Sequence, residues 1–402
     1  MKYILLSVFG LLVLATIADR LSRQPDESDV PVLYWVTDAS PARLAELELF
    51  YVWLEENDYP RFEIRLDNTN KDISKKLIQG VSGVGADIIS MARDEAWLLH
   101  ATGMMEDLVP LAQKHGFTVD ETWPAAAPTF LIDGEQVGFP RGNPVQIYFL
   151  NTDLFAQHGQ PLPPAQWTFE EFEVAGKAFV AAANAGKERQ TVFFCDTINA
   201  LTLRRGMGRS MFNETMTAAT MDNPEAARVL RLMHKWIYED RIIPTQADLD
   251  FFAGSDTNTS RIQLFRQGRY ALLTAARYSI VQLRDGDPMN MVARPLPHGG
   301  FPNGLLGSGS VGIYAKSEHK ELAAYLLEFF ASETYNMSVV HSSDSMPPVP
   351  RFADTEAYRR PAEFPGEWGV HGVISEVMEI GITTCASAFV LPSSANRISN
   401  RG

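Results

Sequence analysis

Residues 138–172 read GFPRGNPVQIYFLNTDLFAQHGQPLPPAQWTFEEF, and this stretch decides the fold that the sequence predicts. The glycines and prolines at 138–144 make a poor interior for a helix or strand. The β-branched and aromatic run after them predicts a strand from Val145 to Leu150. A helix is expected after Thr168, which forms a capping box with Glu171. A turn, a strand and a capped helix in this order suit a passage from one lobe to another.

This stretch resembles the first crossover of bacterial solute-binding proteins that feed ABC importers, in the sugar-binding group that includes the maltose-binding protein. In that family, an aromatic-Pro turn leads into a run with fixed spacing, matched here by Tyr148, Asn151, Asp153, Leu154, Phe155, Gly159, Pro163, Pro164, Trp167, Thr168, Phe169 and Phe172. The resemblance implies an α/β, two-lobed periplasmic-binding-protein fold of type II. Crossover strands would join the lobes, and a ligand cleft would lie between them.

Further blocks continue the resemblance from about residue 32 to residue 351. The pattern predicts strands at 32–36, 61–66, 86–91, 191–195, 270–274 and 311–315. It predicts helices that begin at Ser40-Pro41, near Ile73, at Asn223-Pro224 and after Ser317 as a cap. In the helix after Asn223, the predicted buried face is Ala227, Leu230, His234 and Ile237. The C-terminal end departs from the family pattern, as a shortened terminus or a fragment would.

The predicted organisation has a signal peptide at 1–18, a linker at 19–31 and two discontinuous lobes. Lobe 1 is expected to contain residues 32–140 plus 299–340, and lobe 2 residues 141–298 plus 341–402, with a second crossover near Pro297. Tyr3 to Ala18 is uncharged, but it is shorter than the ~20 residues of a membrane span, so an uncleaved anchor is the less favoured alternative. No cysteine follows this segment, which favours a soluble periplasmic protein over a lipid-anchored one.

Length and composition limit the partners. A chain of 402 residues can form two lobes with separate cores, and a net charge of −14 argues against a nucleic-acid partner. A monomer is expected. Cys195 and Cys385 could form one disulfide or stay as two buried thiols. The sequence has no CxxC and no Cys/His cluster, so neither a structural zinc nor a cofactor is predicted.

The sequence carries no strong enzyme motif. Gly307, Gly309 and Gly312 satisfy GxGxxG, but they precede a predicted strand, whereas a dinucleotide site needs them at the start of a helix. A nucleophile elbow, a Walker lysine loop and HExxH are all absent from the sequence. A glycosidase stays open as the enzyme alternative, because its carboxylates need not be close in sequence.

A sugar-binding cleft needs aromatic faces for the pyranose and polar side chains for its hydroxyls. Residues of these types stand where the resemblance places the cleft. The candidate ligand-binding residues are Trp35, Asp38, Met91, Arg93, Asp94, Arg141, Asn143, Tyr278, Ser308 and Arg351. Each of them separately could equally be an ordinary surface or core residue, so the prediction depends on the set.

The resemblance therefore implies the binding component of an ABC importer, which captures a carbohydrate by closure of its lobes and delivers it to a membrane permease. Two other classes stay open. One is a protein of the same fold that binds a polyamine, an anion or iron, and the other is a binding protein that signals to a sensor without transport.

Overall fold

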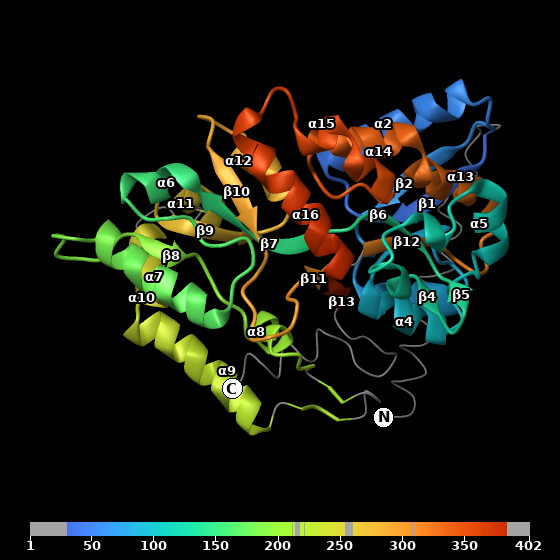
Figure 1. Cartoon of the computed structure of the whole chain (residues 1–402). Helices are drawn as coiled ribbons and strands as arrows, with labels where there is room; N and C mark the ends of the chain where they lie inside the picture. The colour runs from blue at the N-terminus through green and yellow to red at the C-terminus, as the bar shows by residue number, and fades with distance from the viewer. Residues whose placement is uncertain are drawn as a thin grey trace.

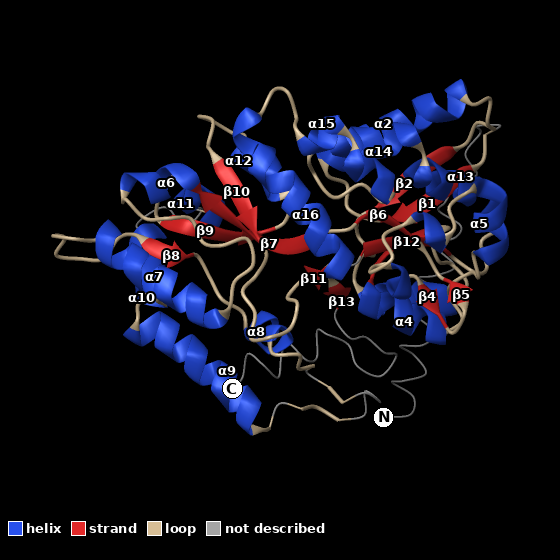
Figure 2. Cartoon of the chain, in the orientation of Figure 1, coloured by secondary structure: helices blue, strands red, loops and turns tan. Residues whose placement is uncertain are grey.

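The computed structural model describes residues 30–210, 212–213, 218–220, 222–253, 260–307 and 309–383, with the backbone only at Arg93, Asp94 and Ala253. The predicted signal peptide, most of the linker, Ser308 and Cys385 lie outside these ranges. The strands form two separate groups with helices around each of them (Figure 2). The chain therefore has two lobes, as the sequence predicts.

The first lobe is built on a five-stranded sheet with the order β2-β1-β3-β12-β6. Its central strand β1 pairs in parallel with β2 and β3, whereas β12 is antiparallel to β3 and β6. The strands are β1 (Val32–Val36), β2 (Glu63–Asp67), β3 (Ile88–Ala92), β6 (Phe139–Gly142) and β12 (Gly309–Ile313). The helices of this lobe are α2 (Pro41–Glu56), α3 (Ile73–Val81), α4 (Arg93–Ala101), α5 (Val109–His115), α13 (Lys320–Ala331) and α14 (Glu333–Ser342). Short elements η1 (Val119–Glu121), η2 (Ala127–Thr129), β4 (Leu131–Ile132) and β5 (Glu135–Gln136) complete it.

The second lobe is built around β7 (Val145–Asn151), which pairs antiparallel with β9, β10 and β11. Its other strands are β8 (Phe193–Cys195), β9 (Tyr270–Ala275), β10 (Met291–Arg294), β11 (Leu305–Leu306) and β13 (Ile382–Thr383). Its helices are α6 (Thr152–Gln157), α7 (Phe169–Ala183), α8 (Ala200–Gly206), α9 (Pro224–His234), η3 (Lys235–Glu239), α10 (Gln246–Ala253), α11 (Arg261–Arg266), α12 (Ser279–Leu283) and α16 (Trp368–Ile380). The chain between α14 and α16 carries η4 (Pro350–Asp354), α15 (Glu356–Arg359) and η5 (Pro365–Glu367).

Local signals set several of these elements as predicted. Ser40 caps α2 by accepting a hydrogen bond from the Arg43 amide, and Pro41 is its first residue. At α7 the capping box is present, because the Thr168 hydroxyl accepts from the Glu171 amide at 3.1 Å and the Glu171 carboxylate accepts from the Thr168 amide at 2.7 Å. Caps of this kind satisfy amides that the first helical turn leaves without partners.

The chain changes sheet twice through short, glycine-containing segments. The first change lies between β6 and β7, where the sequence predicts it, and β7 crosses toward the first lobe in Figure 1. The second lies between Leu306 and Gly309 rather than near Pro297. The physical reason is that β11 still pairs with β7 of the second lobe, through Leu305 with Gln146. The lobe boundaries themselves stay a prediction.

A third connection runs from α14 to α16. Helix α14 packs on α2 of the first lobe, and α16 packs on β7 and β10 of the second, where Figure 1 shows it across the middle of the molecule. A single set of buried hydrophobic residues, including Val145, Ile147, Met346 and Val349, continues from one sheet to the other. The lobes are therefore in apolar contact on this side.

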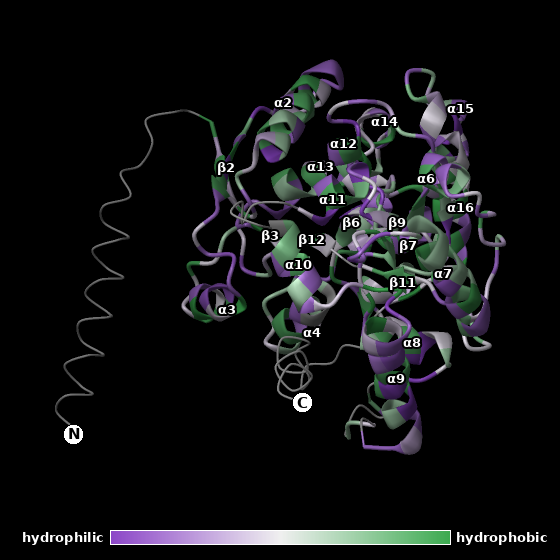
Figure 3. Cartoon of the chain, turned by 90° about the vertical axis from the view of Figure 1, so that its left-hand side faces the viewer, coloured by the Kyte–Doolittle hydropathy of each residue, from purple (hydrophilic) through white to green (hydrophobic). Residues whose placement is uncertain are grey.

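Two predictions about individual residues are wrong. Ser317 does not cap α13, because its hydroxyl donates to Asp87 at 2.6 Å and accepts from the His319 amide. In α9 the buried residues are Ala226 and Val229, whereas Leu230 is 62% exposed and the His234 side chain 63%. Figure 3 shows hydrophilic and hydrophobic positions interleaved along this helix. Cys195 is a free, buried thiol, which is one of the two alternatives expected for it.

Among the residues that the structure describes, no helix is both long and apolar enough to span a bilayer.

Candidate functional site

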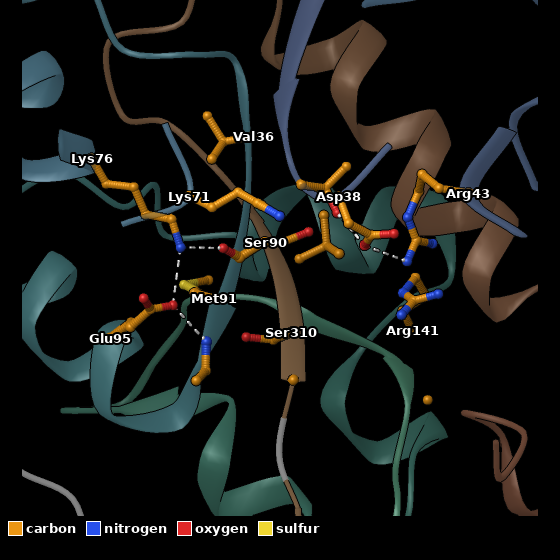
Figure 4. A pocket seen from close by; sticks show the side chains of 15 residues that line it. Val36, Asp38, Arg43, Lys71, Lys76, Ser90, Met91, Glu95, Arg141 and Ser310 are labelled. Carbon is orange, nitrogen blue, oxygen red and sulfur yellow. Dashed lines mark hydrogen bonds and ion pairs between the residues drawn. The ribbon is translucent and has the colours of Figure 1, made fainter. Parts of the chain in front are cut away.

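A pocket of about 310 Å³ opens at the carboxyl ends of β1 and β3, beside the ends of β6 and β12 that face the second lobe (Figure 4). In open α/β sheets, ligands gather at this edge, because loops there can approach a solute without interrupting strand pairing. All its lining residues belong to the first lobe: Val36, Thr37, Asp38, Arg43, Lys71, Lys76, Ser90, Met91, Ala92, Glu95, Arg141, Gly142, Gly309, Ser310 and Val311.

One wall of the pocket is a network of two arginines and two carboxylates. Arg43, whose side chain is only 3% exposed, contacts Asp38 at 3.3 Å and also binds Glu46. Glu46 in turn accepts from Arg141 at 3.2 Å. The Tyr335 hydroxyl donates to the Arg141 carbonyl at 2.8 Å, which ties α14 to the end of β6. These contacts hold the charged groups in fixed positions before any ligand arrives.

Asp38 is ionised in this setting. Burial alone would raise the pKa of its carboxyl, but hydrogen bonds from Ser40 and the charge of Arg43 outweigh burial and hold that pKa well below its usual range. The Asp38 side chain is 43% exposed, so its carboxylate stays accessible from the pocket. Its two oxygens already accept from Thr37, Ser40 and Arg43, so a sugar hydroxyl would share or replace one of these donors at the exposed carboxylate.

The opposite wall is organised by a buried lysine. The Lys76 ammonium, on a side chain 5% exposed, donates to the Ser90 carbonyl at 2.8 Å and to Glu95 at 3.0 Å. Glu95 also accepts from the Ala92 amide at 2.9 Å at the start of α4. Figure 4 shows these three interactions side by side. One lysine thus links α3, β3 and α4 at the pocket.

The structure brings three of the predicted site residues together in this pocket: Asp38, Met91 and Arg141. Trp35 is different, because it is fully buried, donates its indole N–H to the Ser90 hydroxyl at 2.9 Å and packs near Phe330. It therefore offers no aromatic face to a solute in this structure, contrary to its proposed role.

The other predicted residues do not line the pocket. Asn143 is fully buried at the first change of sheet, and neither polar atom of its side chain has a hydrogen-bond partner among the described residues. Tyr278 is 50% exposed at the start of α12, and Arg351 pairs with Glu121 at 3.2 Å. Arg93 and Asp94 start α4, but their side chains are outside what the structure describes, as is Ser308.

Sequence reasoning missed most of the charged lining: Arg43, Lys71, Lys76 and Glu95. Arg43, Lys76 and Glu95 stand in helices, where isolated charges usually mark a solvated face. A signal did exist, because Asp38 and Arg43 flank the Ser40-Pro41 helix start, and a carboxylate beside an arginine there could have indicated a fixed pair.

Comparisons with known proteins identify relatives of this chain. The galactooligosaccharide-binding protein of Bacillus subtilis (strain 168) is 20% identical over 296 residues, which are 71% of this chain and 66% of that protein. The chain thus spans less than two thirds of the length of the curated relatives it matches.

Solved structures show the same fold. An ABC substrate-binding protein from Listeria monocytogenes, in complex with cycloalternan, superposes with a TM-score of 0.75 at 18% identity and covers 92% of this chain and 91% of its own. UgpB from Mycobacterium tuberculosis, in complex with glycerophosphocholine, gives a TM-score of 0.71 at 15% identity and covers 93% and 92%. Residues 54–366 match the family model described as bacterial extracellular solute-binding protein. The chain therefore belongs to the bacterial extracellular solute-binding proteins.

Proposed function

We propose that this protein is the substrate-binding component of an ABC importer, which captures a carbohydrate between its lobes and delivers it unchanged to a membrane permease. The observation that carries the proposal is the polar pocket at the edge of the first sheet, next to both changes of sheet. The relatives named for galactooligosaccharide and cycloalternan binding support a saccharide ligand.

Closure of the lobes is the proposed mechanism. The pocket is lined by the first lobe alone, so a solute bound there would gain further contacts when the second lobe rotates over it. The ligand shifts the equilibrium only by its preference for the closed form. The family consists of binding proteins rather than enzymes, and we propose that no bond of the ligand is broken.

Family membership implies an exported protein. We further propose that it acts in the periplasm, as a monomer, after removal of residues 1–18.

The test is a thermal-shift screen of the mature chain against mono- and oligosaccharides, followed by calorimetry. A ligand at about 100 times its Kd stabilises the native state by about 2.7 kcal/mol, which raises the melting temperature by several degrees. Asp38→Ala should weaken binding at least about tenfold, because the ligand loses one fixed acceptor.

The matched control is Asp354→Ala. Asp354 also pairs with an arginine five residues later, Arg359 at 2.7 Å, but it does not line the pocket. No stabilisation by any saccharide, or equal binding by both variants, would refute the proposed function or its site.

A further inference from the structure

The pocket has an excess of positive charge within a strongly acidic chain. Four cationic side chains line it, Arg43, Lys71, Lys76 and Arg141, against the carboxylates of Asp38 and Glu95. A third carboxylate, Glu46, lies behind the wall with an 8% exposed side chain. Four cations against three carboxylates leave one positive charge, whereas the whole chain carries −14.

The unbalanced cation is Lys71. The other three cations are engaged: Arg43 with Asp38 and Glu46, Arg141 with Glu46, and Lys76 with Glu95. Lys71 is exposed, and no described residue forms an ion pair or a hydrogen bond with its ammonium. In Figure 4 its side chain points toward the middle of the pocket.

The acidic residues nearest to Lys71 in the sequence are occupied elsewhere. Asp72 accepts from the Ser74 amide at 2.9 Å as the cap of α3. Asp67 accepts from the amide and hydroxyl of Thr69 and from the Asn70 side chain. Local carboxylates therefore do not neutralise this lysine.

Two further features suit an anion in the same pocket. The Ser310 hydroxyl, on a residue 4% exposed, is buried and has no hydrogen-bond partner among the described residues. The nine-residue helix α4 (Arg93–Ala101) also starts beside the pocket. The methyl side chain of its N-cap residue Ala92 accepts no hydrogen bond, and the Ala92 amide donates to the Glu95 carboxylate at 2.9 Å. The amide end of a helix carries partial positive charge and favours negatively charged groups.

We propose that the solute is a saccharide that carries an anionic oxygen group, a carboxylate or a phosphate, and that Lys71 pairs with this group. The inference rests on the proposed function and deepens it from carbohydrate to acidic carbohydrate. Lys71 supplies the charge and the Ser310 hydroxyl a further donor for the anionic group, while the exposed Asp38 carboxylate remains for the neutral hydroxyls.

Calorimetry on the mature chain tests this with matched sugars: galactose, galacturonate and galactose 6-phosphate, and the corresponding neutral and uronic oligosaccharides. One acidic form should bind at least about tenfold tighter than its neutral partner, and which form it is identifies the group. The preference should weaken as salt rises, because exposed charges are screened within about 8 Å at physiological ionic strength.

Lys71→Gln should abolish that preference. Lys75→Gln is the control, since Lys75 donates to the Thr69 carbonyl at 2.8 Å, does not line the pocket, and should leave the preference intact. Equal binding of acidic and neutral sugars, an unchanged preference in Lys71→Gln, or equally tight binding of inorganic phosphate or acetate would overturn this inference alone. Absence of binding by every saccharide up to about 1 mM would overturn the proposed function with it.

Discussion

A single arginine of the second lobe holds the end of a helix of the first. Arg277, between β9 and α12, is 1% exposed. Its guanidinium donates to the Val339 and Ser345 carbonyls at 2.9 and 2.6 Å, and to the Val340 carbonyl at 2.9 Å. It also donates to the Ser343 hydroxyl at 3.1 Å. These acceptors lie at or just after the C-terminal end of α14, where most carbonyls have no partner within the helix, although the Val339 carbonyl also accepts from the Ser343 amide at 3.1 Å.

Replacing Arg277 by methionine keeps most of the buried volume and removes these four hydrogen bonds, together with a longer one from Nε to His371 Nδ1 at 3.5 Å. Each buried carbonyl left without a donor costs about 1–3 kcal/mol. Burial lowers the pKa of Arg277 to about 10, which shows that burying its charge is unfavourable. Removing that charge therefore offsets part of the destabilisation from the lost hydrogen bonds. We expect Arg277→Met to lower the free energy of unfolding by about 3 kcal/mol.

Urea denaturation followed by tryptophan fluorescence measures this loss. Arg359→Met is the control, because Arg359 binds Asp354 with a 55% exposed side chain and its loss should cost less than about 1 kcal/mol. Arg277→Lys should fall between the two, since one ammonium has three donors and cannot reproduce the planar fork. A loss below about 1 kcal/mol for Arg277→Met would refute the claim that this side chain fixes α14 to the second lobe.

Three other outcomes are expected. Gly312→Ala should destabilise the fold by about 2 kcal/mol, because its Cβ would lie 2.4 Å from the backbone oxygen of Val137. The control is Gly372→Ala in α16, whose Cβ meets nothing within 4 Å, so this variant should be neutral or stabilising. Equal melting temperatures of the two variants would contradict this prediction. Burial lowers the pKa of His371, so its contribution to the free energy of unfolding should be complete above the usual histidine pKa of about 6.5 and decline as pH falls below that value. His371→Gln should flatten this part of a curve of unfolding free energy against pH. An unchanged slope in the variant would contradict this prediction. Lys76→Met should lower the free energy of unfolding by about 2 kcal/mol, because Glu95 loses the cation with which it pairs. Adding Glu95→Gln should recover part of this loss. If the effects of the two substitutions are simply additive in this double-mutant cycle, the two groups are not coupled.

The parts of the fold that sequence reasoning predicted are those with local causes. Strand β1, the Ser40 cap of α2 and the capping box of α7 each depend on a few neighbouring residues. The second change of sheet has no such cause. Strand β11 has only two residues, and its membership of the second lobe depends on pairing with β7, about 160 residues away.

The predicted residues that line the pocket are those whose placement depends on strand ends, and their role in binding stays a prediction. Asp38 follows β1, and Met91 and Arg141 are next to the last residues of β3 and β6; strand ends at one edge of a sheet meet in space. Trp35 was misplaced because side chains alternate along β1, and only the packing of Phe330 shows which face is the core. In α9 the predicted face failed by one position, because the buried residues Ala226 and Val229 each precede a predicted one, and only packing in the second lobe shows which face is covered.

The pocket and the first change of sheet are continuous along the chain, and this bears on how binding could drive closure. Arg141 and Gly142 line the pocket, and Asn143 follows directly at the passage into β7. The Asn143 amide is buried without hydrogen bonds among the described residues, which is costly in this conformation. If the protein closes around a solute as proposed, a rotation between β6 and β7 could give the Asn143 amide a hydrogen-bond partner. This would lower the free energy of the closed form relative to the open one. A solute held by Arg141 would then need to supply less of the free energy that separates the open form from the closed one.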